Sequence, residues 1–215
     1  DESLRLVGSE MCIRDRELNV YYVAADISKS GPEVEKMYID LLIELRKHIS
    51  IPLVMKLSPF FSSVGNLVTE LERHGVNGVS LFNRFYQPSI NLETLDIVPE
   101  LNLSSSHDSL LALRWVGVLS GNTDLSLAAT GGIHTVADVM KMLLAGADVT
   151  HLCSALLRNG PGHIAKLLAE MEEWMEEHEY TSIKQLKGSA SQRHAMDSAA
   201  FERCNYLQVL RSYKG

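Results

Sequence analysis

The chain has 215 residues, of which 46% are hydrophobic, and a formal net charge of −7 at pH 7. This length and composition suit one domain with a buried core. The negative charge and the absence of a basic block argue against nucleic acid as a partner, because a phosphate backbone would be repelled. No apolar run approaches the roughly 20 residues that span a bilayer, so we expect no membrane partner either.

Cysteine usage points to a reducing compartment. The three cysteines, Cys12, Cys153 and Cys204, have neither the spacing of a disulfide framework nor that of metal ligands. No signal-peptide pattern opens the chain. We therefore expect a cytoplasmic protein with no metal site.

The N-terminal segment differs from the rest of the chain. Residues 1–16 show no helix or strand period, and residues 6–16, LVGSEMCIRDR, resemble the translation of a sequencing adapter. A natural N-terminal arm is the alternative. Foreign sequence does not belong in reasoning about a fold. We therefore exclude residues 1–16 and expect the native sequence to be truncated at its N-terminus.

From residue 17 onward, β-rich runs alternate with helical patterns. In chain order, the β-rich runs cover residues 18–24, 52–58, 76–82, 125–130 and 149–154. Pro32 suits the first turn of the first helix, whose apolar residues recur at helical spacing from Val34 to Ile49. Further helices are expected between Ser62 or Ser63 and Gly75, at 109–119, from Thr135 to Gly146, and at 160–177. Thr135, with Asp138 three residues on, resembles a capping box with Asp in place of Glu.

Two segments stand outside this alternation. Residues 85–103 are irregular and rich in Pro, Asn and Ser, and connections of such length in compact domains are often functional. Residues 180–215 form a polar, partly helical tail. We expect three parts: a foreign segment (1–16), a partial barrel (17–190) and a C-terminal tail (191–215).

Strands that are each followed by a helix or a long crossover predict a parallel α/β sheet. An open doubly wound sheet and a closed barrel both satisfy this pattern. No glycine-rich dinucleotide fingerprint follows the first strand, which weakens the open-sheet interpretation. The glycine pair after residues 125–130 and the small residues after 149–154 favour a TIM (β/α)8 barrel, of which the chain holds the C-terminal portion, about five strands.

Two strand ends carry residues suited to a phosphate group. Gly131 and Gly132 let backbone N–H groups approach an anion without a Cβ in the way. Cys153 and Ser154 follow the next strand and offer a hydroxyl and further amides. A plain strand-to-helix turn explains either loop alone, but both together favour a phosphate site.

Lys56 and Asn19 are two polar residues within predicted strands that could contact a cofactor. Desolvating a lysine is expensive, so Lys56 within LVMKLS should have an anionic or acceptor partner, unless it reaches out of the strand end into water. Asn19 can bond two polar groups at once, although a structural asparagine is equally compatible with the sequence.

Several motifs together resemble the dihydroorotate dehydrogenase family, in its class 1 form. They are, in chain order, ELN at 17–19, IPLVMKLSPFF at 51–61, ATGGI at 129–133, CSAL at 153–156, GP at 160–161 and YTSI at 180–183. No single motif is decisive, but their order and spacing are specific. The resemblance covers nearly all of residues 17–190.

The resemblance implies an FMN-dependent oxidoreductase with a small-molecule substrate. Asn19 and Lys56 would hold the isoalloxazine ring, and Lys56 would also act in catalysis. The phosphate would be held by Gly131, Gly132, Cys153 and Ser154. The family oxidises dihydroorotate to orotate in pyrimidine biosynthesis, by hydride transfer to the flavin and proton removal by a Cys or Ser base. A homodimer is also expected.

The substrate half of the motif departs from the family. Tyr22 stands at the position of the base, where a tyrosine hydroxyl is a weak base at neutral pH. Ser80 and Leu81 align with the family's substrate-binding Asn-Ser, and Asn83 and Arg84 just beyond could replace it. Asn19 is also expected to contact the substrate. Two alternatives remain: a flavin-free phosphate-binding barrel isomerase or lyase, and a pseudoenzyme that binds FMN.

The predicted partial barrel also has consequences for stability. Five strands leave two sheet edges, so we expect the isolated chain to be inactive and to self-associate. We also expect an apolar edge at residues 18–24 to be exposed.

Overall fold

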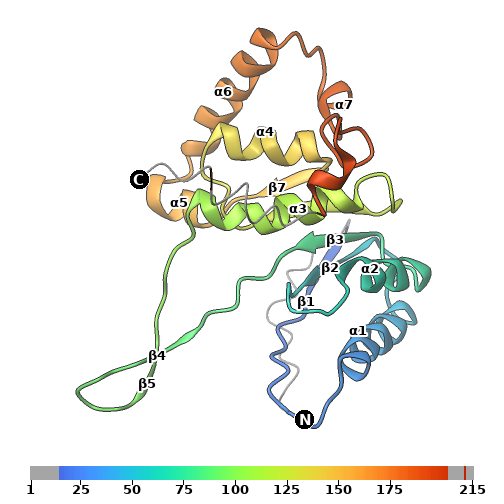
Figure 1. Cartoon of the computed structure of the whole chain (residues 1–215), viewed down its shortest axis with the longest axis vertical. Helices are drawn as coiled ribbons and strands as arrows, with labels where there is room; N and C mark the ends of the chain where they lie inside the picture. Colours follow the sequence, from blue (N-terminus) through green and yellow to red (C-terminus); the bar gives the residue numbers. More distant parts are fainter. Residues whose placement is uncertain (1–14, 203–210, 212–215) are drawn as a thin grey trace.

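The computed structural model of the chain describes residues 15–202 and residue 211. Its centre is a parallel sheet of five strands (Figure 1). The strands, in their order across the sheet, are β1 (Arg16–Asn19), β2 (Leu53–Leu57), β3 (Gly78–Leu81), β6 (Ser126–Thr130) and β7 (Val149–His151).

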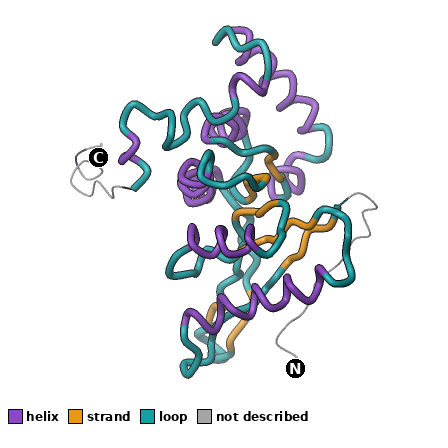
Figure 2. The backbone as a smooth tube through the Cα atoms, turned by 90° about the vertical axis from the view of Figure 1, so that its right-hand side faces the viewer, coloured by secondary structure: helices purple, strands orange, loops and turns teal. Residues whose placement is uncertain are grey.

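Helices follow the strands and pack alongside them (Figure 2). They are α1 (Gly31–Arg46), α2 (Val64–Arg73), the 3-10 turn η1 (Ser106–Asp108), α3 (Ser109–Leu119), α4 (Val136–Ala145), α5 (Ser154–Asn159), α6 (His163–Glu177), α7 (Ile183–Leu186) and the 3-10 turn η2 (Ser198–Ala200). None of these described helices is long and apolar enough to cross a membrane.

The strand order confirms the predicted fold class. Each strand of the sheet pairs with the next one along the chain, apart from an inserted hairpin, and the order never reverses as it does in a doubly wound sheet. The sheet also curves strongly: the Glu17 carboxylate of β1, at one edge, lies 3.9 Å from the His151 ring nitrogen Nδ1 of β7, at the other edge. The chain therefore holds part of a TIM barrel.

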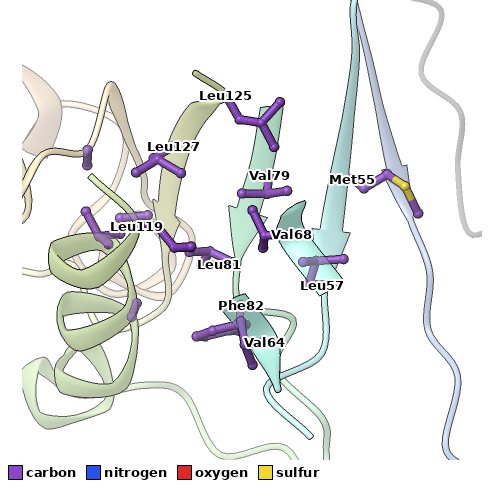
Figure 3. Close-up of a cluster of buried hydrophobic side chains, with 14 of the residues drawn as sticks. Met55, Leu57, Val64, Val68, Val79, Leu81, Phe82, Leu119, Leu125 and Leu127 are labelled. Atoms are coloured by element: carbon purple, nitrogen blue, oxygen red, sulfur yellow. The ribbon is translucent and has the colours of Figure 1, made fainter. Parts of the chain in front are cut away.

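Alternation along the strands divides the sheet into an apolar and a polar face. On β2, Leu53, Met55 and Leu57 are almost fully buried and pack against the helices (Figure 3). Lys56 points to the opposite face, where its strand register places it beside Asn19 and Ser80. The hydrophobic core thus lies between sheet and helices, and the inner face of the curved sheet carries the polar side chains.

The first strand is shorter than predicted and begins earlier. It starts at Arg16, whose amide donates a hydrogen bond to the Pro52 carbonyl (2.9 Å), inside the segment that we predict to be foreign. Beyond Val20 the chain leaves the sheet. The expected exposed apolar edge at 18–24 is wrong for Leu18, Val20 and Tyr22, which are all at least nine-tenths buried in the core cluster, whereas Val23 is 61% exposed.

The irregular segment 85–103 contains a hairpin that the sequence analysis did not predict. Its strands β4 (Pro88–Ile90) and β5 (Ile97–Pro99) pair antiparallel and form an arm that projects from the rest of the chain (Figure 1). Asn91 organises the turn: its side-chain oxygen accepts hydrogen bonds from the amides of Glu93 and Thr94. Local turn chemistry, rather than a hydrophobic period, therefore defines this element.

Two further boundaries differ from the expectation. Strand β7 ends at His151, and Ser154 begins helix α5 instead of ending the strand. The predicted helix 160–177 begins at His163, because Gly160 separates α5 from α6 with a φ of +77°.

Removing a buried side chain from α2 should lower stability sharply. Leu71 is fully buried, so Leu71→Ala should reduce the free energy of unfolding by about 2–5 kcal/mol. Leu92→Ala in the hairpin arm, where the side chain is 82% exposed, should change it by less than about 0.5 kcal/mol. Denaturant unfolding of both variants measures the difference, and equal midpoints would contradict the packing described.

Candidate functional site

A cavity of about 550 Å³ opens at the carboxyl ends of the parallel strands. All five strands of the sheet contribute to it, either directly or through the loop that follows. Its lining consists of Asn19, Tyr21, Lys56, Phe82, Asn83, Arg84, Tyr86, Ser104, Thr130, Gly131, Gly132, Ile133, His151, Cys153 and Ser154. We refer to it as the first cavity. Carboxyl ends of strands are where α/β folds place their ligands.

Lys56 is the cation at the floor of the first cavity. Its side chain is only 21% exposed, and its Nζ lies 3.4 Å from the Glu17 carboxylate. The other Glu17 oxygen faces His151 at 3.9 Å. Lys56 thus has the anionic partner that its position in an apolar strand requires, and it still lines the cavity.

Two asparagines from different strands meet in the cavity wall. The Asn83 side chain donates hydrogen bonds to the Asn19 side-chain oxygen (2.5 Å) and to the Val20 carbonyl (3.2 Å). The Asn83 amide donates to the Leu57 carbonyl (2.7 Å), which fixes the chain just after β3. Asn83 is 92% buried and therefore rigidly held, and both amide groups are presented to the cavity.

The glycine pair after β6 is required by the backbone. Gly131 and Gly132 have φ values of +90° and +75°. A Cβ on Gly132 would lie 2.3 Å from the Ser109 amide nitrogen, whereas a Cβ on Gly131 would meet nothing within 4 Å. Gly132 therefore packs against the start of α3, and Gly131 presents its backbone to open space in the cavity.

The loop after β7 lies next to the glycine pair. Strands β6 and β7 are hydrogen-bonded neighbours with Thr130 opposite His151, so the residues that follow each strand emerge side by side. The Ser154 hydroxyl accepts a hydrogen bond from the Ser104 amide (3.2 Å). Cys153 is an exposed free thiol in the same lining. Cys12 and Cys204 lie outside the described residues.

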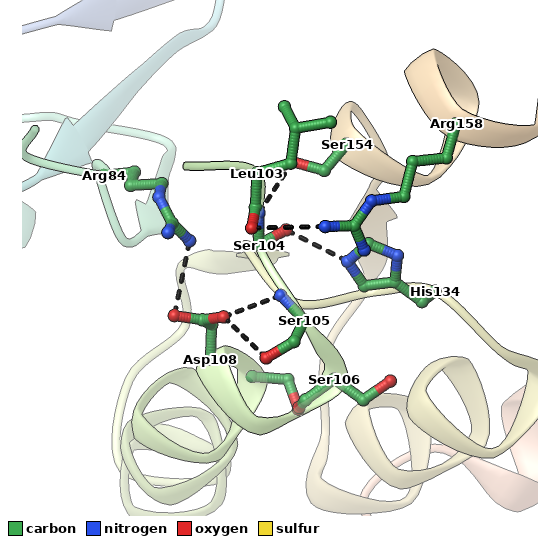
Figure 4. A network of polar contacts seen from close by, with 10 residues as sticks. Arg84, Leu103, Ser104, Ser105, Ser106, Asp108, His134, Ser154 and Arg158 are labelled. Carbon is green, nitrogen blue, oxygen red and sulfur yellow. Dashed lines mark hydrogen bonds and ion pairs between the residues drawn. The ribbon is translucent and has the colours of Figure 1, made fainter. Parts of the chain in front are cut away.

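A polar network connects the segments around these loops (Figure 4). The Ser104 hydroxyl is within hydrogen-bond distance of the His134 ring (3.0 Å), and Arg84 forms an ion pair with Asp108 (3.3 Å). A hydrogen bond from the Ser105 amide, aided by its hydroxyl and by Arg84, holds the pKa of Asp108 below its ordinary value.

Asp138 fixes the segment between the glycine pair and α4. Burial raises the pKa of this carboxyl, but hydrogen bonds from Ser106, His134 and Thr135 outweigh burial and leave the pKa below its ordinary value. Its Oδ2 accepts from the Ser106 hydroxyl (2.7 Å) and from the amides of His134 (3.0 Å) and Thr135 (2.9 Å). This is the capping box predicted from Thr135 and Asp138.

Two residues predicted for the site do not line the first cavity. Ser80 is fully buried on the inner face of β3, and its hydroxyl has no hydrogen-bond partner within residues 15–202. Tyr22 is 91% buried and lines a different cavity, with its hydroxyl 3.4 Å from the Lys29 ammonium. The remaining predicted residues, Asn19, Lys56, Asn83, Gly131, Gly132, Cys153 and Ser154, lie together.

Three residues at or beside the first cavity were missed by the sequence analysis. Glu17 belongs to a quoted motif but was given no role, although it is the partner of Lys56. His151 lies in a predicted strand that is too short to show which face each residue occupies. Ser104 borders the irregular segment, where neither a helical nor a strand period indicates direction.

The two glycines should respond differently to alanine. Both substitutions place a side chain at positive φ, which costs about 1–2 kcal/mol. Gly132→Ala should be more destabilising than Gly131→Ala, because only the former drives a Cβ into backbone atoms. Thermal unfolding of both variants measures this, and an equal loss would contradict the placement of Gly132 against α3.

Asp138 should stabilise the fold in a pH-dependent way. At pH 7, Asp138→Ala leaves buried donors without an acceptor and should cost about 1–3 kcal/mol. Because the pKa is depressed in the folded state, this stability is present above the ordinary value of 3.8 and is lost as the pH falls through the folded-state pKa. The gap between wild type and variant in urea unfolding should therefore shrink below pH 3.8. The exposed Asp96→Ala serves as the control, and a gap independent of pH would contradict the assignment.

Comparison with known proteins identifies the family. A family model described as dihydroorotate dehydrogenase matches residues 18–175. The catalytic subunit of dihydroorotate dehydrogenase B (NAD(+)) from Listeria innocua is 27% identical over 190 residues, which cover 84% of this chain and 60% of that protein. The corresponding subunit from Shouchella clausii is 26% identical over 160 residues, which cover 73% and 52%.

A plant protein shares a shorter stretch. The chloroplastic dihydropyrimidine dehydrogenase (NADP(+)) of Arabidopsis thaliana is 30% identical over 69 residues, 32% of this chain and 16% of that protein. The alignments with the two bacterial subunits span about half to three fifths of those proteins. With the family match extending over most of the sequence and a curved parallel sheet that gathers its polar residues at the strand ends, the chain belongs to the dihydroorotate dehydrogenase family.

Proposed function

We propose that this chain supplies the flavin-binding part of an FMN-dependent oxidoreductase that oxidises a dihydropyrimidine-like substrate. An oxidoreductase of the dihydroorotate dehydrogenase type follows from the family and its relatives. One observation carries the finer proposal: residues from separate strand ends, which the family resemblance assigns to the flavin, line a single cavity.

The cavity fits the cofactor that the family implies. Gly131 leaves a space that a Cβ would fill, next to the Cys153–Ser154 loop, and this is the kind of cradle that a phosphate group requires. Gly131, Gly132, Cys153 and Ser154 would hold the phosphate, and Asn19 and Lys56 would hold the ring. FMN, when bound, would accept a hydride from the substrate.

The protein's own groups have distinct tasks in this proposal. The Lys56 ammonium, oriented by Glu17, would offset negative charge at the ring. Asn83 and Asn19 orient one another. The amide donors of Asn83 are used by Asn19 and the Val20 carbonyl, so its side-chain oxygen would accept a hydrogen bond from a pyrimidine N–H. Arg84 at the rim of the cavity adds a cation that could bind an anionic substituent of the substrate.

The residue at the family's base position lies outside the first cavity. Tyr22 stands at the base position in sequence but lines the other cavity, beside Lys29. This placement favours, as a second candidate function, an FMN-binding protein without dehydrogenase turnover. Adding dihydroorotate to the full-length protein separates the two candidates: bleaching of bound flavin at 450 nm supports the dehydrogenase, and an unchanged spectrum supports the second candidate.

A role in pyrimidine biosynthesis, a cytoplasmic location and a homodimer stay predictions. So do the foreign origin of residues 1–16 and the limits of the barrel part and the tail.

FMN should bind more tightly than riboflavin, which lacks the phosphate. Hydrogen bonds to a charged group contribute about 1.5–3 kcal/mol, so the ratio of the two dissociation constants should be about tenfold or more. Gly131→Ala places a Cβ in the open space of the cradle and should reduce this ratio towards one. Quenching of flavin fluorescence on titration with the 215-residue chain measures both constants.

A matched glycine provides the control for this titration. Gly160, between α5 and α6, has a φ of +77° and, like Gly131, nothing within 4 Å of an ideal Cβ, but it lies outside the cavity lining, so Gly160→Ala should leave the ratio unchanged. Absence of FMN binding, or equal affinities for FMN and riboflavin in the wild type, would refute the flavin assignment and leave the flavin-free isomerase or lyase as the alternative.

A further inference from the structure

A second cavity of about 540 Å³ lies beside the first, and neither the family resemblance nor the proposed function assigns it a role. The loop after β1, helix α1, the loop after β2 and the chain after β3 enclose it. Its lining consists of Tyr22, Val23, Ala24, Val34, Tyr38, Ser58, Phe60, Phe61, Phe85, Tyr86, Gln87 and Pro88. Volumes of this size hold small organic molecules.

Aromatic rings dominate the second cavity and are arranged in fixed pairs. Tyr38 and Phe61 meet edge to face, with ring centroids 5.0 Å apart. Phe60 and Phe85 form a similar pair at 5.6 Å. Such walls present both ring faces and ring edges, so a flat ligand can stack on one ring and meet the edge of another.

The wall between the two cavities is itself a stack of rings. Phe85 lines the second cavity and Tyr21 lines the first, and the two rings are stacked with centroids 4.4 Å apart and planes inclined by 15°. Tyr86 lines both cavities, and its amide donates a hydrogen bond to the Tyr21 hydroxyl (3.1 Å). An aromatic ligand stacked on Phe85 would therefore be separated from the first cavity by the rings of Phe85 and Tyr21.

The rim leaves apolar surface in water. Phe60 is 71% exposed, Val23 61% and Tyr86 54%, and all three line the same cavity. Apolar surface that is contiguous and concave marks a binding site more often than scattered exposed residues do. The floor is dry by comparison, because Tyr38 is 1% exposed and burial raises the pKa of its hydroxyl to about 12.

The described lining of the second cavity contains no charged side chain. Lys29 approaches from outside: its ammonium lies 3.4 Å from the Tyr22 hydroxyl and 5.7 Å from the centre of that ring, but it is not part of the lining. The available polar groups are hydroxyls and the Gln87 amide, which are neutral. An ionised ligand would lose its hydration here without meeting a counter-charge in the lining itself.

We infer that the second cavity is a binding site for an uncharged, planar aromatic compound of about two fused rings. The ligand would stack on Phe85, meet the edges of Phe60 and Phe61, and direct a hydroxyl or carbonyl group to Tyr22 or Gln87. Binding at this site does not depend on FMN, so the inference stands or falls separately from the proposed function.

A matched pair of probes tests the inference with the 215-residue chain. 2-Naphthol and 2-naphthalenesulfonate share one ring system, but only the second carries a charge at pH 7. In equilibrium dialysis, 2-naphthol should bind at least tenfold more tightly. Phe60→Ala should weaken 2-naphthol binding about threefold to tenfold, because it removes one aromatic wall while changing an exposed residue.

Two further variants make the result specific to this cavity. Leu157→Ala, at an equally exposed apolar residue on α5, should not change the affinity for 2-naphthol. Val23→Arg places a cation at the rim and should shift the preference towards 2-naphthalenesulfonate. Far-ultraviolet circular dichroism verifies that each variant is folded. Equal affinity for the two probes, or a 2-naphthol affinity that neither Phe60→Ala nor Val23→Arg alters, would overturn the inference.

Discussion

The register of the parallel strands determines which side chains face the hydrophobic core and which face the first cavity. Pairing of Asn19 with Lys56, of Lys56 with Ser80 and of Ser80 with Ala128 sets these residues at one level on one face of the sheet. A shift by a single residue would turn Lys56 into the apolar layer against α1 and α2 and expose Met55 in its place. The same register that packs the core therefore also builds the floor of the first cavity.

Strong periodic patterns made the fold predictable from sequence. The five strands, their parallel pairing and the helices between them follow from apolar runs and caps, as at Thr135 and Asp138. The hairpin arm escaped prediction because its strands have only three residues each and depend on the Asn91 turn. Burial of Leu18, Val20 and Tyr22 could not be anticipated either, since it depends on tertiary packing that no local pattern encodes.

The candidate site was predictable where a residue type has few structural explanations. A lysine in an apolar strand and a glycine pair at a strand end each imply a chemical need, and both line the cavity. Glutamate and histidine have many structural roles, so their presence in a strand did not indicate a site. Glu17 and His151 become interpretable only once the curvature of the sheet brings its two edges together, which no local pattern encodes.

The two cavities have opposite chemical character although they share Tyr86. The first combines cations, amides and open backbone groups, whereas the lining of the second is aromatic and carries no charge within the described part of the chain. The Tyr21–Phe85 stack separates them. The structure therefore offers a polar lining and an apolar lining within a few side chains of each other.

Glu17 contacts Lys56 through one carboxylate oxygen and His151 through the other, and so spans the concave side of the sheet from its first strand to its last. Through Glu17, Lys56 on β2 is therefore linked to His151 on β7, three strands away. The distance between β1 and β7 would change if a strand were added at either end of the sheet or if His151 were substituted. Either change would displace the Lys56 ammonium. The curvature of the sheet therefore sets the position of the Lys56 cation in the first cavity.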